Sequence, residues 1–308
     1  MSDVQPAGTG PVQDGHDRRI DLGGPVHYVD FGGRPDGPTF VLVHGLGGSH
    51  LNWELFAPLL TPTGRVLAVD LPGFGLSEPG ERPATVPANV LVLEAFVRRV
   101  ADGPVVLIGN SMGGMISILL TGRTPDLIGG LVLIDAALPL PLPASSPRDA
   151  VASGAFLTYA LPGVGERLMR GRRRRVGPRA LVHTMLRLCG VDPGALPPEL
   201  VARSVTLVER RADVAGMDRA FLSAARSLAW VLTFARSYRT TMSSITAPVL
   251  LVHGEQDRLV PVAAARDAAR RNPTWRYVEL PGVGHVPQLQ VPDRLAGIVA
   301  DWLAVTRS

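Results

Sequence analysis

The turn at residues 109–114, Gly-Asn-Ser-Met-Gly-Gly, constrains the fold more than any other segment of the chain. It follows the apolar, strand-like run 104–108 and precedes the helix-like run 115–120. A serine between a buried strand and a helix requires a sharp turn, and glycines two residues before and after it let the two elements pass closely. The Ser111 hydroxyl is then held at a helix N-terminus, where unpaired N–H groups favour developing negative charge. The segment predicts a nucleophilic serine on a strand–turn–helix unit.

A serine hydroxyl needs a base to take its proton and an acid to orient that base. Among the seven histidines, His285 lies in the segment 281–287, whose glycines and prolines predict a loop. Asp257 follows the apolar, strand-like run 247–254, where a loop begins. We therefore predict that Ser111, Asp257 and His285 form a catalytic triad.

Other acids and histidines also lie at the ends of apolar runs. Asp135 ends the strand-like run 131–135 and is the alternative for the acid of the triad. Asp70 ends an earlier run, and we expect it to order or cap a loop. His44 and His253 are expected to be hydrogen-bonded structural residues.

Four motifs in this chain order resemble those of the α/β-hydrolase family. The segment 44–48, His-Gly-Leu-Gly-Gly, resembles the family's oxyanion loop, and the segment 69–77 resembles its strand-end signature before the serine turn. The serine turn and the two loops with the acid and the histidine complete the set. The similarity spans about residues 21–304 apart from a divergent middle. It implies an α/β-hydrolase fold, with a mostly parallel central sheet, helices on both faces and an inserted helical cap.

The resemblance also implies acyl transfer through a covalent intermediate. Ser111 would attack a carbonyl carbon while His285, held in one tautomer by Asp257, takes the serine proton and returns it to the leaving group. Water would then hydrolyse the acyl-enzyme. The oxyanion hole implied by the family is formed by the backbone N–H groups of Leu46 and Met112, with Gly47 as the alternative to Leu46.

Composition excludes several other chemistries. All 31 basic residues are arginine, so a P-loop lysine, a pyridoxal Schiff base and a Ser-Lys dyad are impossible. The single cysteine, Cys189, can form neither an intrachain disulfide nor a cysteine zinc cluster, and we expect it to be a small core residue of the cap. We predict no metal and no cofactor.

The chain divides into three parts by pattern. Residues 1–20 are polar and rich in glycine and proline, and they predict a flexible N-terminal arm rather than a signal peptide. Residues 21–138 and 246–308 carry the strand and helix patterns of the core. Residues 139–245 begin with repeated prolines, continue with helical patterns and predict the cap (lid) insertion. Because no run approaches about 20 apolar residues, we expect no membrane span and a cytoplasmic location.

The basic charge is concentrated in the predicted cap, which holds 16 arginines and seven acidic residues while the whole chain has a net charge of +4. The run Arg172–Arg175 suits anionic lipid, nucleic acid or an acidic substrate group. No aromatic residues are interleaved with it. We therefore expect a solvated surface and no nucleic-acid partner. The sequence leaves monomer and dimer open.

Apolar side chains next to the motifs predict a hydrophobic acyl pocket. The residues assigned to substrate binding are Trp53, Asn110, Val260 and Val286, with Phe156, Leu157 and Phe221 of the cap as weaker candidates. Such walls favour an ester-like substrate with a small to medium hydrophobic group over a sugar or a peptide.

Three functions remain compatible with the motifs. Ser111 argues against epoxide hydrolases and haloalkane dehalogenases, whose turn carries aspartate. Carbon–carbon bond hydrolases of vinylogous diketone ring-cleavage products share a similar serine turn but usually carry tryptophan after the catalytic histidine, where this chain has Val286. We therefore prefer a serine carboxylic ester hydrolase. Carbon–carbon cleavage is the alternative, followed by other serine chemistry such as perhydrolysis, lactone or amide cleavage, and by a ligand receptor of the same fold without turnover.

Overall fold

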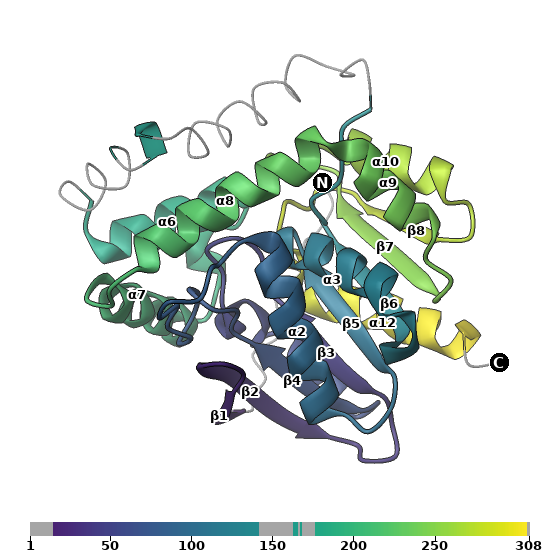
Figure 1. Cartoon of the computed structure of the whole chain (residues 1–308), viewed down its shortest axis with the longest axis horizontal. Coiled ribbons are helices and arrows are strands. Elements are labelled where there is room, and N and C mark those ends of the chain that lie inside the picture. The colour runs from purple at the N-terminus through teal and green to yellow at the C-terminus, as the bar shows by residue number, and fades with distance from the viewer. Residues whose placement is uncertain (1–14, 142–162, 166, 168–175, 307–308) are drawn as a thin grey trace.

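An eight-stranded sheet in the order β1-β2-β4-β3-β5-β6-β7-β8 forms the centre of the computed structural model, which describes residues 15–141, 163–165, 167 and 176–306 (Figure 1). β2 pairs antiparallel with β1 and β4, and the other neighbouring strands are parallel. The prediction of a mostly parallel sheet is confirmed. The strands are β1 (His16–Asp21), β2 (Pro25–Gly33), β3 (Thr39–Val43), β4 (Arg65–Val69), β5 (Val105–Asn110), β6 (Ile128–Ile134), β7 (Val249–Gly254) and β8 (Arg276–Leu280).

Helices cover both faces of this sheet, as the sequence predicts. The described α-helices are α1 (Ala57–Leu60), α2 (Val86–Val100), α3 (Met112–Arg123), α6 (Pro178–Leu188), α7 (Pro198–Ala212), α8 (Met217–Thr233), α9 (Ala235–Ser243), α10 (Val262–Arg271), α11 (Pro287–Gln290) and α12 (Pro292–Thr306). Short 3₁₀ turns are η1 (His50–Trp53), η2 (Pro125–Leu127) and η3 (Pro193–Ala195). Buried side chains of α2, α3, α9 and α10 pack in one hydrophobic cluster, and those of α1 and α12 pack in another.

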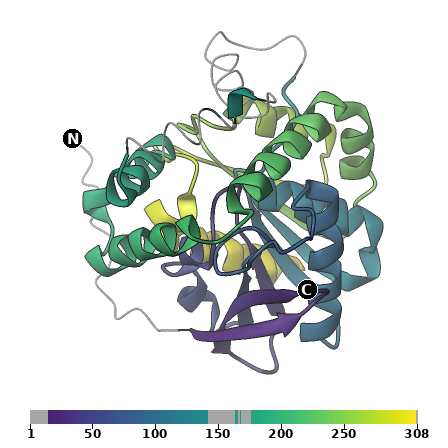
Figure 2. The same cartoon turned by 60° about the vertical axis from the view of Figure 1, so that its left-hand side comes forward.

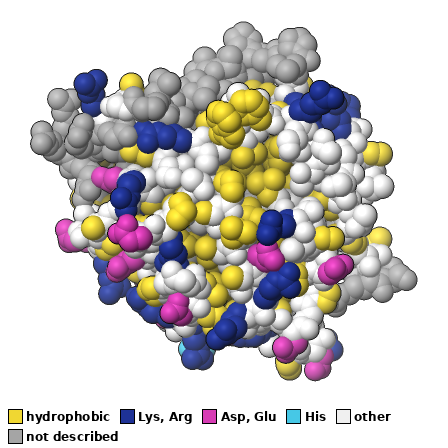
Figure 3. Space-filling model, viewed as in Figure 1, with side chains coloured by type: hydrophobic (Ala, Val, Ile, Leu, Met, Phe, Trp, Pro, Cys, Tyr) yellow, Lys and Arg dark blue, Asp and Glu magenta, His cyan; other side chains and the backbone are white. Residues whose placement is uncertain are grey.

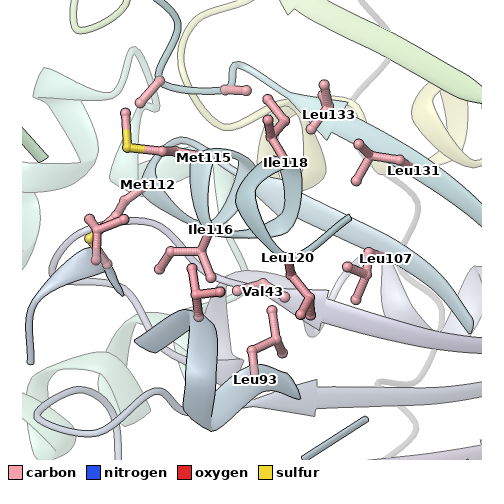
Figure 4. Packing of buried hydrophobic residues seen from close by; sticks show 14 of the residues in the cluster. Val43, Leu93, Leu107, Met112, Met115, Ile116, Ile118, Leu120, Leu131 and Leu133 are labelled. Atoms are coloured by element: carbon pink, nitrogen blue, oxygen red, sulfur yellow. The ribbon is translucent and has the colours of Figure 1, made fainter. Parts of the chain in front are cut away.

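The two-residue period of a strand explains why one segment serves both clusters. In β3, Val41 and Val43 belong to the cluster under α2 and α3, whereas Phe40 and Leu42 belong to the cluster under α1 and α12. Figure 4 shows the first cluster, with side chains of α3 lying against those of the strands. Burial on both faces is the expected environment of parallel strands.

The predicted N-terminal arm of residues 1–20 is too long. His16–Asp21 form β1, which pairs residue by residue with Pro25–Asp30 of β2 at the edge of the sheet. The side chains of β1 are mostly exposed, so the strand is held by its backbone hydrogen bonds and needs no alternation of apolar residues. That is why the polar sequence conceals it. Residues 1–14 lie outside the described part of the chain.

Helices α6, α7 and α8, here called the inserted helices, lie between β6 and β7 in the chain and beside the layered core in space (Figures 1 and 2). They approach loops that follow strands: Arg211 of α7 donates a hydrogen bond to the Gly73 carbonyl at 3.2 Å. A Cβ atom added at Gly73 would lie 2.4 Å from Cβ of Ala220 in α8. The contact is therefore close-packed. By contrast, Tyr238 and Met242 of α9 pack in the sheet cluster with α3.

The face seen in Figure 3 mixes hydrophobic side chains with scattered charged ones. Trp230 and Phe234, at the end of α8, are 65% and 53% exposed, and their ring centroids are 4.2 Å apart. Among the described helices, none combines the length and the apolar character required to cross a bilayer. The residues Phe156 and Leu157 and the run Arg172–Arg175 lie outside the described residues.

Candidate active site

The backbone of Ser111 is strained between β5 and α3. Its φ and ψ are 54° and −119°, and Ser111 and Asp135 are the two non-glycine residues with positive φ in the described part of the chain. Surrounding hydrogen bonds impose this conformation: Ser111 N donates to Ile134 O at 3.1 Å, and Ala137 N donates to Ser111 O at 3.0 Å. Strain of this kind costs on the order of 1–3 kcal/mol and clusters at functional sites.

The glycines around Ser111 are required by close backbone contacts. A Cβ atom at Gly109 would lie 2.6 Å from the carbonyl carbon of Gly113. One at Gly113 would lie 2.1 Å from the carbonyl oxygen of Val43 in β3. Both distances are far below van der Waals contact, so the strand, the turn and the helix meet only because these side chains are absent. The sequence prediction of a close strand–turn–helix crossing is matched by this geometry.

His285 and Asp257 form a buried pair. The His285 Nδ1 atom and the Asp257 Oδ2 atom are 2.7 Å apart, and 4% and 8% of the two residues are exposed. The other carboxylate oxygen of Asp257 accepts hydrogen bonds from the backbone N–H groups of Leu259 at 2.7 Å and Val260 at 3.0 Å. Burial alone would raise the pKa of Asp257, but the charge of His285 and its hydrogen bond outweigh burial and lower it. The carboxylate is therefore the stable form.

Asn110 connects the serine turn to the histidine loop. Its side-chain nitrogen donates to the carbonyl of His285 and to that of Ile134, both at 3.1 Å. The residue before Ser111 is thus bonded to the backbone of the predicted base. Asn110 was assigned to substrate binding by its place in the motif, whereas its amide nitrogen holds the two loops together.

The loop of His285 is also fastened to the end of α6. His285 N donates to the carbonyl of Cys189 at 2.9 Å. Gln290 donates from Nε2 to the Gly190 carbonyl at 2.8 Å, and its Oε1 accepts from Gly284 N at 2.8 Å. We call this set of three hydrogen bonds the Cys189–Gln290 clamp. No sequence pattern predicts this clamp, because two of its partners are backbone carbonyls.

The loop proposed for the oxyanion hole lies against Ser111. A Cβ atom on Gly45 would be 3.0 Å from Cβ of Ser111. Met112 is the first residue of α3, and its N–H group has no acceptor within the described residues, nor does that of Leu46. Gly47 has a φ of 75°, and a Cβ there would lie 3.3 Å from the ring of Phe221. The N–H groups of Leu46 and Met112 thus stay the predicted donors of the oxyanion hole.

The predicted pocket residues occupy different surroundings. Val286 is buried in an apolar cluster that joins η1 and α11 to α6 and α7. Val260 is partly buried at the edge of the α2–α3 cluster, and Phe221 of α8 packs against the same cluster. Trp53 is fully buried beside Phe56, in the cluster under α1 and α12. Trp53 is therefore a core residue, and its position directly after the loop motif was a misleading signal.

Asp135 and His253 lie directly behind the His285–Asp257 pair. Asp135 Oδ1 accepts a hydrogen bond from Gly254 N at 2.9 Å. His253 Nε2 lies 3.6 Å from Asp135 Oδ1 and 3.5 Å from Asp257 Oδ2, and it donates to the Val260 carbonyl at 2.9 Å. Asp257, rather than Asp135, is thus the acid hydrogen-bonded to His285, in agreement with the preferred assignment. Sequence reasoning placed His253 as a structural residue, and its bond to Val260 fits that role.

A second buried acid lies below the loop after β3. Asp70 Oδ2 is 2.8 Å from His27 Nδ1 and 2.9 Å from His50 Nδ1, and the backbone N–H groups of His50 and Leu76 also donate to the carboxylate. Burial would raise the pKa of Asp70, but its histidine partners hold it far below its usual range. Asp70 orders the loops at this edge of the sheet, which agrees with its predicted role.

Within the described part of the chain, two groups of ligand atoms are close enough together to hold a metal ion. They are His27, His50 and Asp70, and Asp135, His253 and Asp257, each within 4.8 Å. In the first group both histidine Nδ1 atoms point at the same carboxylate oxygen. In the second, His253 Nε2 already donates to a carbonyl. These hydrogen bonds account for the arrangement without an ion.

The chain matches the Alpha/beta hydrolase family over residues 40–298. It belongs to this family, and the predicted fold is confirmed. Among its relatives, a pimeloyl-[acyl-carrier protein] methyl ester esterase of Xanthomonas axonopodis pv. citri is 27% identical over 282 residues, covering 87% of this chain and 96% of the relative. The enzyme of the same name from Aromatoleum aromaticum is 28% identical, with 86% and 97% covered.

Solved structures extend the likeness in fold. A haloalkane dehalogenase variant from Bradyrhizobium elkanii superimposes with a TM-score of 0.78 at 23% identity, covering 96% of this chain and 98% of that chain. At this identity the likeness concerns the fold alone. The named esterases support the prediction of an ester-hydrolysing enzyme.

Proposed function

We propose that this chain is a serine hydrolase that cleaves a carboxylic ester through an acyl-enzyme on Ser111. The observation that carries the proposal is the buried 2.7 Å pair of His285 and Asp257, whose loop is bonded through Asn110 to the strained serine turn. A strained nucleophile, a base oriented by a carboxylate, and free N–H donors beside the nucleophile are the parts that acyl transfer requires. Esterase relatives that align over most of the chain support the same reaction.

The proposed mechanism assigns one task to each group. His285, which presents Nδ1 to Asp257, takes the Ser111 proton on Nε2 as the hydroxyl attacks the ester carbonyl. The N–H groups of Met112 and Leu46 stabilise the negative oxygen of the tetrahedral intermediate. The imidazolium returns the proton to the departing alcohol, and water, activated by the same histidine, releases the acid.

We infer a small to medium hydrophobic acyl group as the substrate class. Val286 and Phe221 support it, because both lie in apolar surroundings next to the catalytic loops. The relatives named for a methyl ester of a pimeloyl group support a short alcohol leaving group. Cleavage of carbon–carbon bonds stays the alternative prediction. The cap boundaries at residues 139–245 and a cytoplasmic location also stay predictions.

An active-site probe tests the proposal directly. We expect a fluorophosphonate to label the wild-type chain with a stoichiometry of one at Ser111, and p-nitrophenyl esters to give a burst of p-nitrophenol. Ser111→Ala is expected to lose both labelling and turnover, by up to about 10⁶-fold in kcat. Ser117→Ala is the matched control, because Ser117 lies in the second turn of α3 and donates to the Gly113 carbonyl. Labelling that persists in Ser111→Ala, or no turnover with any acyl length in the wild type, would refute the assignment.

A further inference from the structure

Asp135 is built into the site as rigidly as the serine. It follows β6 as Ser111 follows the neighbouring strand β5, and its φ of 44° makes it the other strained non-glycine residue of the described chain. Its side chain is fully buried. A strained conformation is kept only when the surrounding structure over-determines it. Both the backbone strain and the burial of a carboxyl group are unfavourable in free energy. Filling the space behind Asp257 would require neither of them, so Asp135 calls for another explanation.

The hydrogen bonds of Asp135 leave one of its oxygens unexplained. Oδ1 accepts from Gly254 N at 2.9 Å. Oδ2 is buried, and within the described residues no donor reaches it. The His253 Nε2 atom lies 3.6 Å from Oδ1 and donates its proton to the Val260 carbonyl. A buried carboxylate oxygen with neither donor nor cation is strongly unfavourable.

The groups around Asp135 supply negative charge and no compensating cation. Asp257 is the neighbouring acid: its ligand oxygen, that of Asp135 and a His253 nitrogen lie within 4.8 Å of one another, and a side-chain hydrogen bond with Asp257 contributes to raising the pKa of Asp135. Burial lowers the pKa of His253, against the opposing charge of Asp257, and keeps this imidazole neutral. Burial first, and then the charge of Asp257, raise the pKa of the Cys189 thiol, at the end of α6, so this group is neutral as well.

Two more distant groups complete the electrostatic surroundings. Glu279 of β8 acts on His253 from the far side of β7, and His285 is paired with Asp257 on the side of the serine. Burial first, and the charge of Asp257 second, raise the pKa of Asp135 well above its usual range. The neutral acid is thus favoured by the same surroundings that leave Oδ2 without a donor.

We propose that Asp135 is a neutral carboxylic acid that donates a hydrogen bond from Oδ2 to the Asp257 carboxylate, and that it is a positioning residue for the Asp257–His285 pair. The proton converts the unsatisfied acceptor into a donor, so both carboxyl groups are satisfied. The hydrogen bond fixes the plane of Asp257 and withdraws electron density from it, which moderates its interaction with the imidazolium. This role rests on the proposed function, since it acts through the triad.

Infrared spectroscopy tests the proton without any turnover. A protonated carboxyl group has a C=O stretch that a carboxylate lacks. We expect the difference spectrum of wild type minus Asp135→Asn at pH 7 to contain this band, and that of wild type minus Asp267→Asn to lack it. Asp267 is the matched control, because it is buried and ion-paired with Arg270 and Arg271. A spectrum without the Asp135 band overturns the proposal whether or not the chain hydrolyses esters.

The pH profile of kcat/KM tests the positioning role. Asn is isosteric with the neutral acid and can donate, so Asp135→Asn should leave the acid limb in place. Asp135→Ala removes the donor and leaves Asp257 a better partner for the imidazolium, so its acid limb should move up by about half a pH unit. If Asp135 were an anion, both variants would lose a negative charge near His285. The acid limb of each variant would then move to lower pH, which would overturn the proposal.

The test of the Asp135 proposal stays decisive even if one of the variants does not fold. Asparagine tolerates positive φ better than other non-glycine residues, so Asp135→Asn is expected to fold. If Asp135→Ala does not fold, the infrared band and the Asp135→Asn profile still support or overturn the proposal. Asp267→Asn should leave the acid limb unchanged, which shows that loss of any buried aspartate is not enough to move it.

Discussion

The chain contains two buried clusters of aspartate and histidine that differ in how their hydrogen bonds are shared. Around Asp70, one carboxylate receives donors from two histidine rings and two backbone N–H groups. Around Asp257, the same number of donors serves two carboxyl groups, three at Asp257 and one at Asp135, and Oδ2 of Asp135 has none in the described chain. The Asp70 arrangement, here called the saturated cluster, satisfies one carboxylate completely and holds loops in place. The arrangement of Asp135, Asp257 and His285, here called the reactive cluster, contains a shared proton on Asp135 and a base, His285, that can accept one. This difference separates a structural cluster from a candidate reactive one.

The largest expected effect is on kcat and comes from a substitution in the reactive cluster. Asp257→Asn should lower kcat by about 10⁴-fold, because the amide favours the wrong tautomer of His285 and removes the charge that stabilises the imidazolium. The free energy of unfolding should change little by comparison. Steady-state kinetics with p-nitrophenyl esters measure the first and chemical denaturation the second. If Asp135→Asn proves the more damaging change, the acid of the triad has been misassigned.

A substitution in the saturated cluster should lower stability strongly and kcat only slightly, the reverse of Asp257→Asn. Asp70→Asn leaves buried histidine donors without their anion, so we expect it to lower the free energy of unfolding by about 4 kcal/mol. The kcat of the folded fraction should fall less than tenfold. Urea denaturation followed by circular dichroism gives the stability. Asp30→Asn, which removes an ion pair with Arg65 near the surface, is the control and should cost less than about 1 kcal/mol. Equal losses in both variants would contradict the comparison.

Protonation of His44, whose ring accepts a hydrogen bond from the residue after Asp70, should lower the free energy of unfolding as the pH falls. Burial lowers the pKa of His44 from 6.5 to about 4, against the charge of Asp70. In the folded chain the ring accepts a hydrogen bond on Nε2 from Leu71 N, which requires the neutral form. The unfolded chain therefore binds this proton at a higher pH than the folded chain. Stability from the neutral ring is complete above pH 6.5 and is lost as the pH falls towards 4, by about 3 kcal/mol at most.

The slope of stability against pH checks this prediction. Denaturation at several pH values should show a decline between pH 6.5 and 4, and His44→Gln should have a shallower decline although it is less stable throughout. His50 opposes the trend, because its pKa is raised: burial disfavours its charge, but Asp70 more than compensates. The His50 contribution is present below pH 6.5 and is lost as the pH rises through its folded pKa. An equally steep decline in His44→Gln would assign the slope to another group.

The smallest expected effect on kcat comes from the Cys189–Gln290 clamp, which holds the loop of His285 from outside the reactive cluster. Gln290→Ala removes two bonds of the Cys189–Gln290 clamp, so we expect about a tenfold loss of kcat with a modest loss of stability. Gln256→Ala, at an exposed glutamine of the acid loop, is the control. A kcat equal to the wild type in Gln290→Ala would mean that His285 is positioned by Asp257 and Asn110 alone.

The sequence predicted those parts of the site that depend on side-chain chemistry at the end of a strand. Ser111, Asp257 and His285 were predicted because a strained turn needs glycines and because the acid and the base follow apolar runs. Asp135 was recognised as an acid at a strand end, but its shared proton depends on burial and on the distance to Asp257. Neither can be obtained from spacing along the chain.

The misjudged positions have physical reasons of their own. β1 was missed because an exposed edge strand is held by backbone hydrogen bonds and shows no apolar alternation. Trp53 was assigned to the pocket because it follows the loop motif, although a 3₁₀ turn, η1, carries its ring into the core. The Cys189–Gln290 clamp was invisible because main-chain carbonyls leave no trace in residue type.

That clamp has a consequence for how substrate preference could change in this protein. The inserted helices lie in the segment predicted from the sequence to form the cap, which would suggest a module to exchange freely between relatives. Yet the carbonyls of Cys189 and Gly190, at the C-terminus of α6, hold the loop of the proposed base. A graft that shifts the end of α6 by one residue would withdraw those carbonyls and disable catalysis before it altered selectivity. Exchange is therefore expected to succeed only when the donor segment delivers the chain to residues 189–190 in the same register, whatever side chains it brings.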